Sequence, residues 1–125
     1  MNAVLWVLQA LLAAAFLGAG AMKLTRTREA LVANGMGWAE GFSPTAIKLI
    51  GLAEVLGAIG VILPALTKIA PILVPIAASC LALTMVGAVL VHIQRKDPPG
   101  RVIPSMVLAV LAVIVAFGRF GAYAF

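Results

Sequence analysis

The sequence predicts an all-α protein, a transmembrane four-helix bundle with a short interfacial segment between its first two helices. Hydrophobic residues make up 64% of the 125 residues and charged residues only 10%, against roughly 45–50% and 25% in soluble domains. The mean hydropathy is +1.18. The apolar residues are gathered into runs of about twenty, the length at which a helix crosses a bilayer core. Residues 1–125 are therefore expected to form a single transmembrane domain.

The first span is expected at about residues 3–22, an apolar run that only Gln9 interrupts. The Ala-Gly-Ala triplet near its end also resembles a signal-peptide cleavage site, but no Lys or Arg precedes the run, so a retained span is favoured. Polarity then returns over residues 23–43, which are expected to lie at the membrane interface. Residues 27–34 have the pattern of a short helix there, and Trp38 suits the headgroup level.

The other three spans are expected at about residues 44–63, 69–92 and 103–123. Ser43 suits the N-cap of the second span, because its hydroxyl can accept a hydrogen bond from an amide of the first turn. Pro64 is expected to stop the same span, because the residue before a proline is disfavoured in a helix. A short turn and a polar loop separate the remaining runs.

The net charge of +5 is carried by short clusters between the apolar runs, not by a stripe of the kind that binds nucleic acid. Four crossings place the loops 23–43 and 93–102 on one face of the membrane. The face with these loops has the larger number of basic residues, namely Lys23, Arg26, Arg28, Arg95, Lys96 and Arg101. The opposite face has only Lys68 and Arg119. The positive-inside rule therefore predicts a multi-pass protein of the cell inner (plasma) membrane with cytoplasmic loops and both termini outside. Arg119 is expected to be an anchor that snorkels to the surface.

Glu54 is the residue that most needs a functional explanation. It lies near the middle of the second span, where a charged side chain costs about 2.5–3.5 kcal/mol on insertion scales and usually faces the protein interior. Helical geometry places it in one sector with Gly51, Gly57 and Ala58. This small-residue face is expected to point inward, because it allows a neighbouring helix to approach closely.

The topology brings three ionisable side chains into one half of the membrane. Lys23 closes the first span, Glu54 lies one or two turns deeper, and His92 closes the third span. A Lys–Glu pair lowers the cost of burying either charge, and a histidine beside it can carry a proton at physiological pH. The expected ligand- and proton-binding pocket consists of Lys23, Glu54, His92, Gly51 and Thr84. The structural alternative is that Lys23 and His92 lie at headgroup level and that Glu54 only locks helices together.

One cysteine, Cys80, and one histidine are present in the chain. The chain therefore forms no internal disulfide, holds no dithiol pair, and lacks the ligands for a metal site or a bis-histidine haem of its own. No motif for a flavin or an iron–sulfur cluster is recognisable either. Whether the protein is an enzyme is left open, because no self-sufficient catalytic motif is present.

Three segments resemble the DoxX-like family of four-helix membrane proteins, and the resemblance covers nearly the whole chain. They are Phe16-Leu-Gly-Ala-Gly-Ala-Met-Lys23-Leu, then Gly51-Leu-Ala-Glu54 with the residues up to Pro64, and Gly87-Ala-Val-Leu-Val-His92. The recurrent polar positions of the family fall on Lys23, Glu54 and His92. The family takes its name from a subunit associated with quinone-linked thiosulfate oxidation. Other relatives are similar to parts of membrane oxidoreductase complexes or, in animals, to assembly chaperones for channels.

The resemblance implies an accessory, quinone- or lipid-interacting subunit of a membrane redox complex. A quinone is the one cofactor that the resemblance suggests. The implied partners are the lipid bilayer and other membrane or redox subunits. No nucleic acid is expected, and self-association is left open. One alternative is a small proton-coupled transporter, although such carriers hold their glutamate in the first span. The other alternative is a non-catalytic membrane assembly or chaperone protein.

Overall fold

The computed structural model describes residues 2–33, 37–121 and 123–124. Within these residues the chain is helical, and four segments are long and apolar enough to cross a membrane. They are α1 (Asn2–Thr25), α3 (Pro44–Gly60) continued by α4 (Leu63–Thr67), α5 (Leu73–Gln94) and α6 (Pro99–Phe120). The predicted all-α transmembrane four-helix bundle is confirmed.

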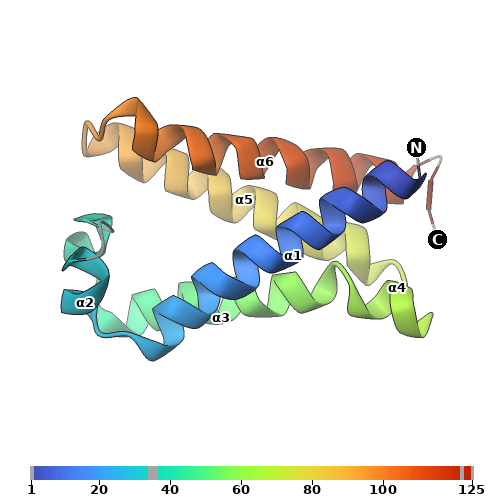
Figure 1. Cartoon of the computed structure of the whole chain (residues 1–125), viewed down its shortest axis with the longest axis horizontal. Coiled ribbons are helices and arrows are strands. Elements are labelled where there is room, and N and C mark those ends of the chain that lie inside the picture. Colours follow the sequence, from blue (N-terminus) through green and yellow to red (C-terminus); the bar gives the residue numbers. More distant parts are fainter. Residues whose placement is uncertain (1, 34–36, 122, 125) are drawn as a thin grey trace.

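The four long helices close into a bundle in which each contacts two neighbours. Helix α1 packs against α3 and α6, and α5 packs against α6 and α3. Figure 1 shows α2 and the turn between α5 and α6 at one end of the bundle, and α4 with the start of α1 and the end of α6 at the other. The two polar loops therefore lie at the same end, as an even number of crossings requires.

The segment between α1 and α3 folds back onto the bundle. It contains the short helix α2 (Arg28–Ala33) and the 3₁₀ helix η1 (Gly37–Gly41). The hydroxyl of Thr27 accepts a hydrogen bond from the Ala30 amide at 3.1 Å and so caps α2. The expected helix at residues 27–34 is thus present at 28–33, and its expected end at Asn34 lies outside the described residues. Buried Leu31 and Ala39 pack against Ile47 of α3, which fixes the segment to the end of the bundle.

Helix α3 begins as the sequence predicts but ends differently. The Ser43 hydroxyl accepts a hydrogen bond from the Ala46 amide at 3.1 Å, and Pro44 occupies the first turn. The helix ends at Gly60, and α4 then begins at Leu63 with Pro64 in its first turn. The expected stop at Pro64 is corrected, because a proline in a first turn loses no helical hydrogen bond and can start a helix.

The last two helices begin at positions that hydropathy alone misplaces. Helix α5 begins at Leu73 instead of residue 69, after a turn in which Lys68 and Ala70 have positive φ angles of 58° and 48°. Helix α6 begins at Pro99 instead of residue 103, with extended Pro98 as its N-cap, and ends at Phe120 instead of residue 123. A proline in the first turn starts α6 before the apolar run does.

The core lies where the four helices meet. Leu12, Phe16, Leu81 and Val115 are at most 1% exposed and form its centre. The buried positions of α3 are Ile47, Gly51, Glu54, Gly57 and Ala58. This confirms that the small-residue face of the second span points inward, and it brings Glu54 with it.

Candidate functional site

A cavity of about 430 Å³ lies between α1, α3 and α5 at the end of the bundle that carries α2. Most of its wall is apolar or aromatic. Its polar lining residues are Lys23 from α1, Glu54 from α3, Thr84 and His92 from α5, and Ser105 from α6. A mainly apolar cleft with a few convergent polar groups is the usual form of a small-molecule site.

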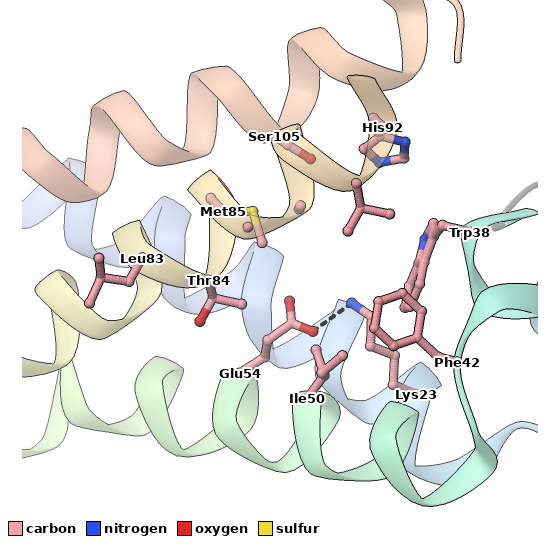
Figure 2. A pocket seen from close by; sticks show the side chains of 13 residues that line it. Lys23, Trp38, Phe42, Ile50, Glu54, Leu83, Thr84, Met85, His92 and Ser105 are labelled. Atoms are coloured by element: carbon pink, nitrogen blue, oxygen red, sulfur yellow. Dashed lines mark hydrogen bonds and ion pairs between the residues drawn. The ribbon is translucent and has the colours of Figure 1, made fainter. Parts of the chain in front are cut away.

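An ion pair between Lys23 and Glu54 is the polar centre of this cavity. The Lys23 Nζ lies 2.5 Å from the Glu54 Oε1, and the side chains are only 9% and 1% exposed. Figure 2 shows the pair between α1 and α3. The pairing explains how two charges are tolerated at this depth, because each offsets the desolvation of the other.

Two aromatic rings complete the cavity beside the ion pair. The Lys23 Nζ lies 5.5 Å from the centroid of the Trp38 ring, a distance at which a cation is attracted to the ring face. Phe42 packs edge-on against Trp38 with ring centroids 5.6 Å apart. Sequence reasoning assigned Trp38 only to the headgroup level and did not single out Phe42. The folding back of η1 makes both rings part of the site.

His92 lines the same cavity, but its hydrogen-bond partner lies outside the membrane-spanning helices. The His92 Nδ1 lies 2.7 Å from the Asp97 Oδ2, and the Arg95 Nε lies 3.5 Å from the same oxygen. The hydrogen bond from His92 is the main cause that lowers the pKa of Asp97, and the charge of Arg95 lowers it further against the effect of desolvation. An ionised Asp97 that accepts from Nδ1 leaves Nε2 as the acceptor nitrogen of the neutral ring. The sequence contained no spacing signal that pointed to Asp97.

The remaining two predicted pocket residues have different positions. Thr84 lines the cavity, and its hydroxyl donates a hydrogen bond to the Cys80 carbonyl at 2.9 Å. Gly51 is buried at the contact between α1 and α3 instead of lining the cavity. A Cβ atom there would lie 2.7 Å from the Lys23 Cβ and 2.9 Å from the Gly20 carbonyl oxygen. Gly51 therefore acts on the site by letting Lys23 approach α3.

A second polar cluster, at the opposite end of the bundle, was not predicted. Gln9 is fully buried; its Nε2 donates to the Val61 carbonyl at 2.7 Å, and its Oε1 accepts from the Arg119 Nε at 2.8 Å. The Arg119 Nη1 donates to the Asn2 Oδ1 at 2.6 Å and to the Tyr123 carbonyl at 2.9 Å. Val61 follows the last residue of α3, so Gln9 satisfies a carbonyl that the end of a helix leaves without a helical partner.

The expectation that Arg119 snorkels to the surface is corrected by this cluster. Arg119 is only 2% exposed, and its guanidinium carbon lies 5.7 Å from the centroid of the Trp6 ring. The guanidinium has five N–H donors and finds acceptors inside the bundle, which makes a buried position tolerable. Gln9, which interrupts the first apolar run, was the only sequence signal for this contact.

No three His, Cys, Asp or Glu side chains of the described residues lie together in a way that would hold a metal ion. The cavity instead offers a cation, a carboxylate, an imidazole and two hydroxyls in an apolar surround. This set can hydrogen-bond an uncharged polar ring and exchange protons with it.

Four helices of membrane-spanning length define a multi-pass membrane protein that contacts the lipid bilayer. The chain matches the model of the DoxX-like family over residues 7–115 and therefore belongs to that family. The matched range includes Lys23, Glu54 and His92. No curated protein and no solved structure matches the chain.

Proposed function

We propose that this DoxX-like protein is an accessory subunit of a membrane redox complex and binds a quinone headgroup in the cavity at Lys23 and Glu54. The observation that carries the proposal is a buried ion pair that faces an apolar, aromatic-walled cavity within the depth of the membrane. A volume of about 430 Å³ lies within the range of roughly 300–1,000 Å³ typical of ligand sites. The site thus suits a ring-sized ligand that arrives from the lipid phase.

The residues present fit such a headgroup. The Lys23 ammonium has three N–H donors and donates one hydrogen bond to Glu54, so further donors remain for a carbonyl oxygen. The rings of Trp38 and Phe42 offer an aromatic wall against which a planar ring can pack. A bound quinone would supply two-electron chemistry coupled to proton uptake, with electrons from another subunit.

The proton-exchanging groups of this chain are Glu54 and His92. Glu54 lies in the ion pair, where it can accept or return a proton without leaving its position. His92 lies between the cavity and the loop, since it lines the cavity and is hydrogen-bonded to Asp97, whose side chain is 18% exposed. We assign to this pair the exchange of protons between the cavity and water at the end that carries α2.

The same proposal places the end with α2 on the cytoplasmic side of a bacterial inner membrane. The loops there hold most of the exposed basic residues, and Lys48 near the start of α3 is a further basic residue at this end that the count over the loops did not include. Basic residues in short loops favour the cytoplasmic side. A ligand in the cavity would therefore exchange protons with the cytoplasm.

Quenching of Trp38 fluorescence by a short-chain ubiquinone in nanodiscs tests the binding. The chain has two tryptophans, so Trp6→Phe leaves Trp38 as the only reporter, and Trp38→Phe gives the quenching caused by quinone dissolved in the lipid. We expect saturable quenching of Trp38 above that background. Glu54→Gln or Lys23→Met should weaken it at least tenfold, whereas Lys68→Gln at the opposite end should not.

The pH dependence of this binding distinguishes a chemical role of Glu54 from a packing role. We expect the affinity of the parent protein to change between pH 5 and pH 8 and that of Glu54→Gln to change much less. A Glu54→Gln variant that binds and titrates like the parent contradicts the assignment. Equal quenching of Trp38 and Trp6 by the quinone contradicts the site itself.

A further inference from the structure

A second cavity, here called the interfacial cavity, lies at the same end of the bundle and has a different character. Its volume is about 290 Å³. It lies where α1 ends, α2 begins and α3 begins. Its lining residues are Lys23, Thr25, Arg26, Thr27, Arg28, Glu29, Pro44, Ile47 and Lys48. Four cations and one carboxylate thus surround a space that is smaller than the cavity at Lys23 and Glu54, here called the main cavity.

Backbone carbonyls hold two of these cations in place. The Lys48 Nζ donates to the Leu24 carbonyl at 3.0 Å, at the end of α1. The Arg28 Nη1 donates to the Phe42 carbonyl at 3.3 Å. Both side chains keep further N–H donors, since a lysine has three and an arginine five. Among the described residues, the guanidinium of Arg26 has no hydrogen-bond or ion-pair partner, although its backbone amide donates to the Met22 carbonyl at 2.9 Å.

The net charge of the interfacial cavity is positive after its internal pairs are counted. The Lys23 ammonium is compensated by Glu54, which leaves Arg26, Arg28 and Lys48 opposite the single carboxylate of Glu29. No buried acid of α3 or α1 other than Glu54 is present to neutralise them. An anion that enters the space meets an excess of donors.

The position of the interfacial cavity at the ends of the membrane spans favours a lipid phosphate as the bound anion. The ends of two apolar spans form its wall, and lipid phosphates lie at this level. Leu52 lies one helical turn further along α3 from Lys48 and is 45% exposed, and Leu49 beside Lys48 is 62% exposed. A charged headgroup in the cavity would therefore continue into acyl chains along an apolar helix face.

We propose that the interfacial cavity binds the phosphate of an anionic phospholipid headgroup through Arg26, Arg28 and Lys48. Inorganic phosphate shares the chemistry of the headgroup but not the apolar contact with α3, so the lipid is the ligand to which the proposal commits. Basic pockets beside membrane spans are known to bind anionic headgroups. The site is separate from the proposed quinone cavity, and Lys23 forms part of the wall of both.

Native mass spectrometry of the full chain tests the proposal. The protein is reconstituted in phosphatidylcholine nanodiscs with a rising fraction of phosphatidylglycerol, then released and weighed. We expect the parent to retain one phosphatidylglycerol in preference to phosphatidylcholine. Arg26→Gln and Lys48→Gln should each weaken this retention about fivefold, since one basic residue near an anionic surface contributes about that factor.

A charge-matched control uses the other loop of the same end. Lys96 is exposed and does not line the interfacial cavity, so Lys96→Gln removes the same charge and should leave the retention unchanged. Arg26→Gln replaces a guanidinium that makes no hydrogen bond or ion pair with the described residues and is therefore expected to fold, which circular dichroism checks. The proposal is overturned if the parent retains both lipids equally, if Lys96→Gln weakens retention as much as Arg26→Gln, or if millimolar inorganic phosphate displaces the lipid.

Discussion

At the scale of single residues, the pair of Lys23 and Glu54 decides the character of the main cavity. Removal of one partner leaves the other charge buried without compensation, which in buried pairs costs about 3–5 kcal/mol. We expect Lys23→Met and Glu54→Gln each to destabilise the protein, and the double variant to recover part of the loss because no lone charge remains. SDS titration in micelles measures the free energies of unfolding. Strictly additive losses in the double variant contradict the direct pairing.

The contribution of Asp97 to the stability of the folded protein depends on pH. Its pKa is held below the ordinary value of 3.8, chiefly by the hydrogen bond from His92. A lowered pKa in the folded state means that the contribution is full above pH 3.8 and is lost as the pH falls through the lowered value. We expect Asp97→Asn to lower the melting temperature at pH 7 and the difference from the parent to vanish in strong acid.

Glu40 provides the control for this experiment. It is an exposed carboxylate in η1, so Glu40→Gln removes an acidic group with little structural consequence. Its melting temperature should follow that of the parent at every pH. If Asp97→Asn loses the same amount of stability at pH 7 and in strong acid, the hydrogen bond with His92 does not stabilise the ionised carboxylate.

At the scale of the helices, the contact between α1 and α3 depends on two glycines. A Cβ atom on Gly20 would lie 2.7 Å from the carbonyl oxygen of Gly51, and one on Gly51 would lie 2.9 Å from that of Gly20. Since backbone atoms form both contacts, the helices must separate to admit a side chain. Such a separation would also move Lys23 away from Glu54.

We therefore expect Gly20→Ala to destabilise the protein by about 1–3 kcal/mol, the usual cost of overpacking, and to weaken binding in the main cavity. Gly18 is the matched control, because a Cβ atom there meets nothing within 4 Å. Gly18→Ala should be neutral or stabilising by up to about 1 kcal/mol, since alanine favours a helix over glycine. Thermal unfolding in detergent measures both variants. Equal effects would show that the contact tolerates a methyl group.

At the scale of the whole molecule, the topology places the main cavity, the interfacial cavity and both polar loops at one end. The opposite end holds α4 and the cluster of Gln9 and Arg119. A ligand, a lipid headgroup and protons would thus meet on one side of the membrane. Which side this is decides whether the cavity communicates with the cytoplasm.

Labelling of introduced cysteines determines that side. In a Cys80→Ser background, Lys96→Cys and Lys68→Cys report on the two ends of the bundle. We expect a membrane-impermeant maleimide to label Lys68→Cys in intact spheroplasts and Lys96→Cys only after lysis, because the basic end is expected to be cytoplasmic. Labelling of Lys96→Cys in intact spheroplasts reverses the orientation and with it the proposed proton exchange.

The sequence by itself determined the four crossings, the shared end of the two polar loops and the inward face of α3. These properties follow from the lengths of the apolar runs, which the thickness of the bilayer sets, and from the spacing of small residues, which helical geometry sets. The N-cap at Ser43 could also be predicted from the sequence, because it depends on neighbouring residues alone. The end of α3 at Gly60 and the start of α6 at Pro99 could not be predicted. Pro64 was taken as the end of the second span and Pro99 as part of a loop, although each proline lies in the first turn of a helix.

Only the tertiary structure decided which polar side chains meet. Lys23 and Glu54 pair directly, whereas His92 turns to Asp97, and Gln9 joins Arg119 across 110 residues. The rotation and crossing of packed helices set these contacts, and the pattern of one sequence does not define either quantity. The membrane-spanning bundle is thus a property of composition, and the candidate site is a property of how its helices pack.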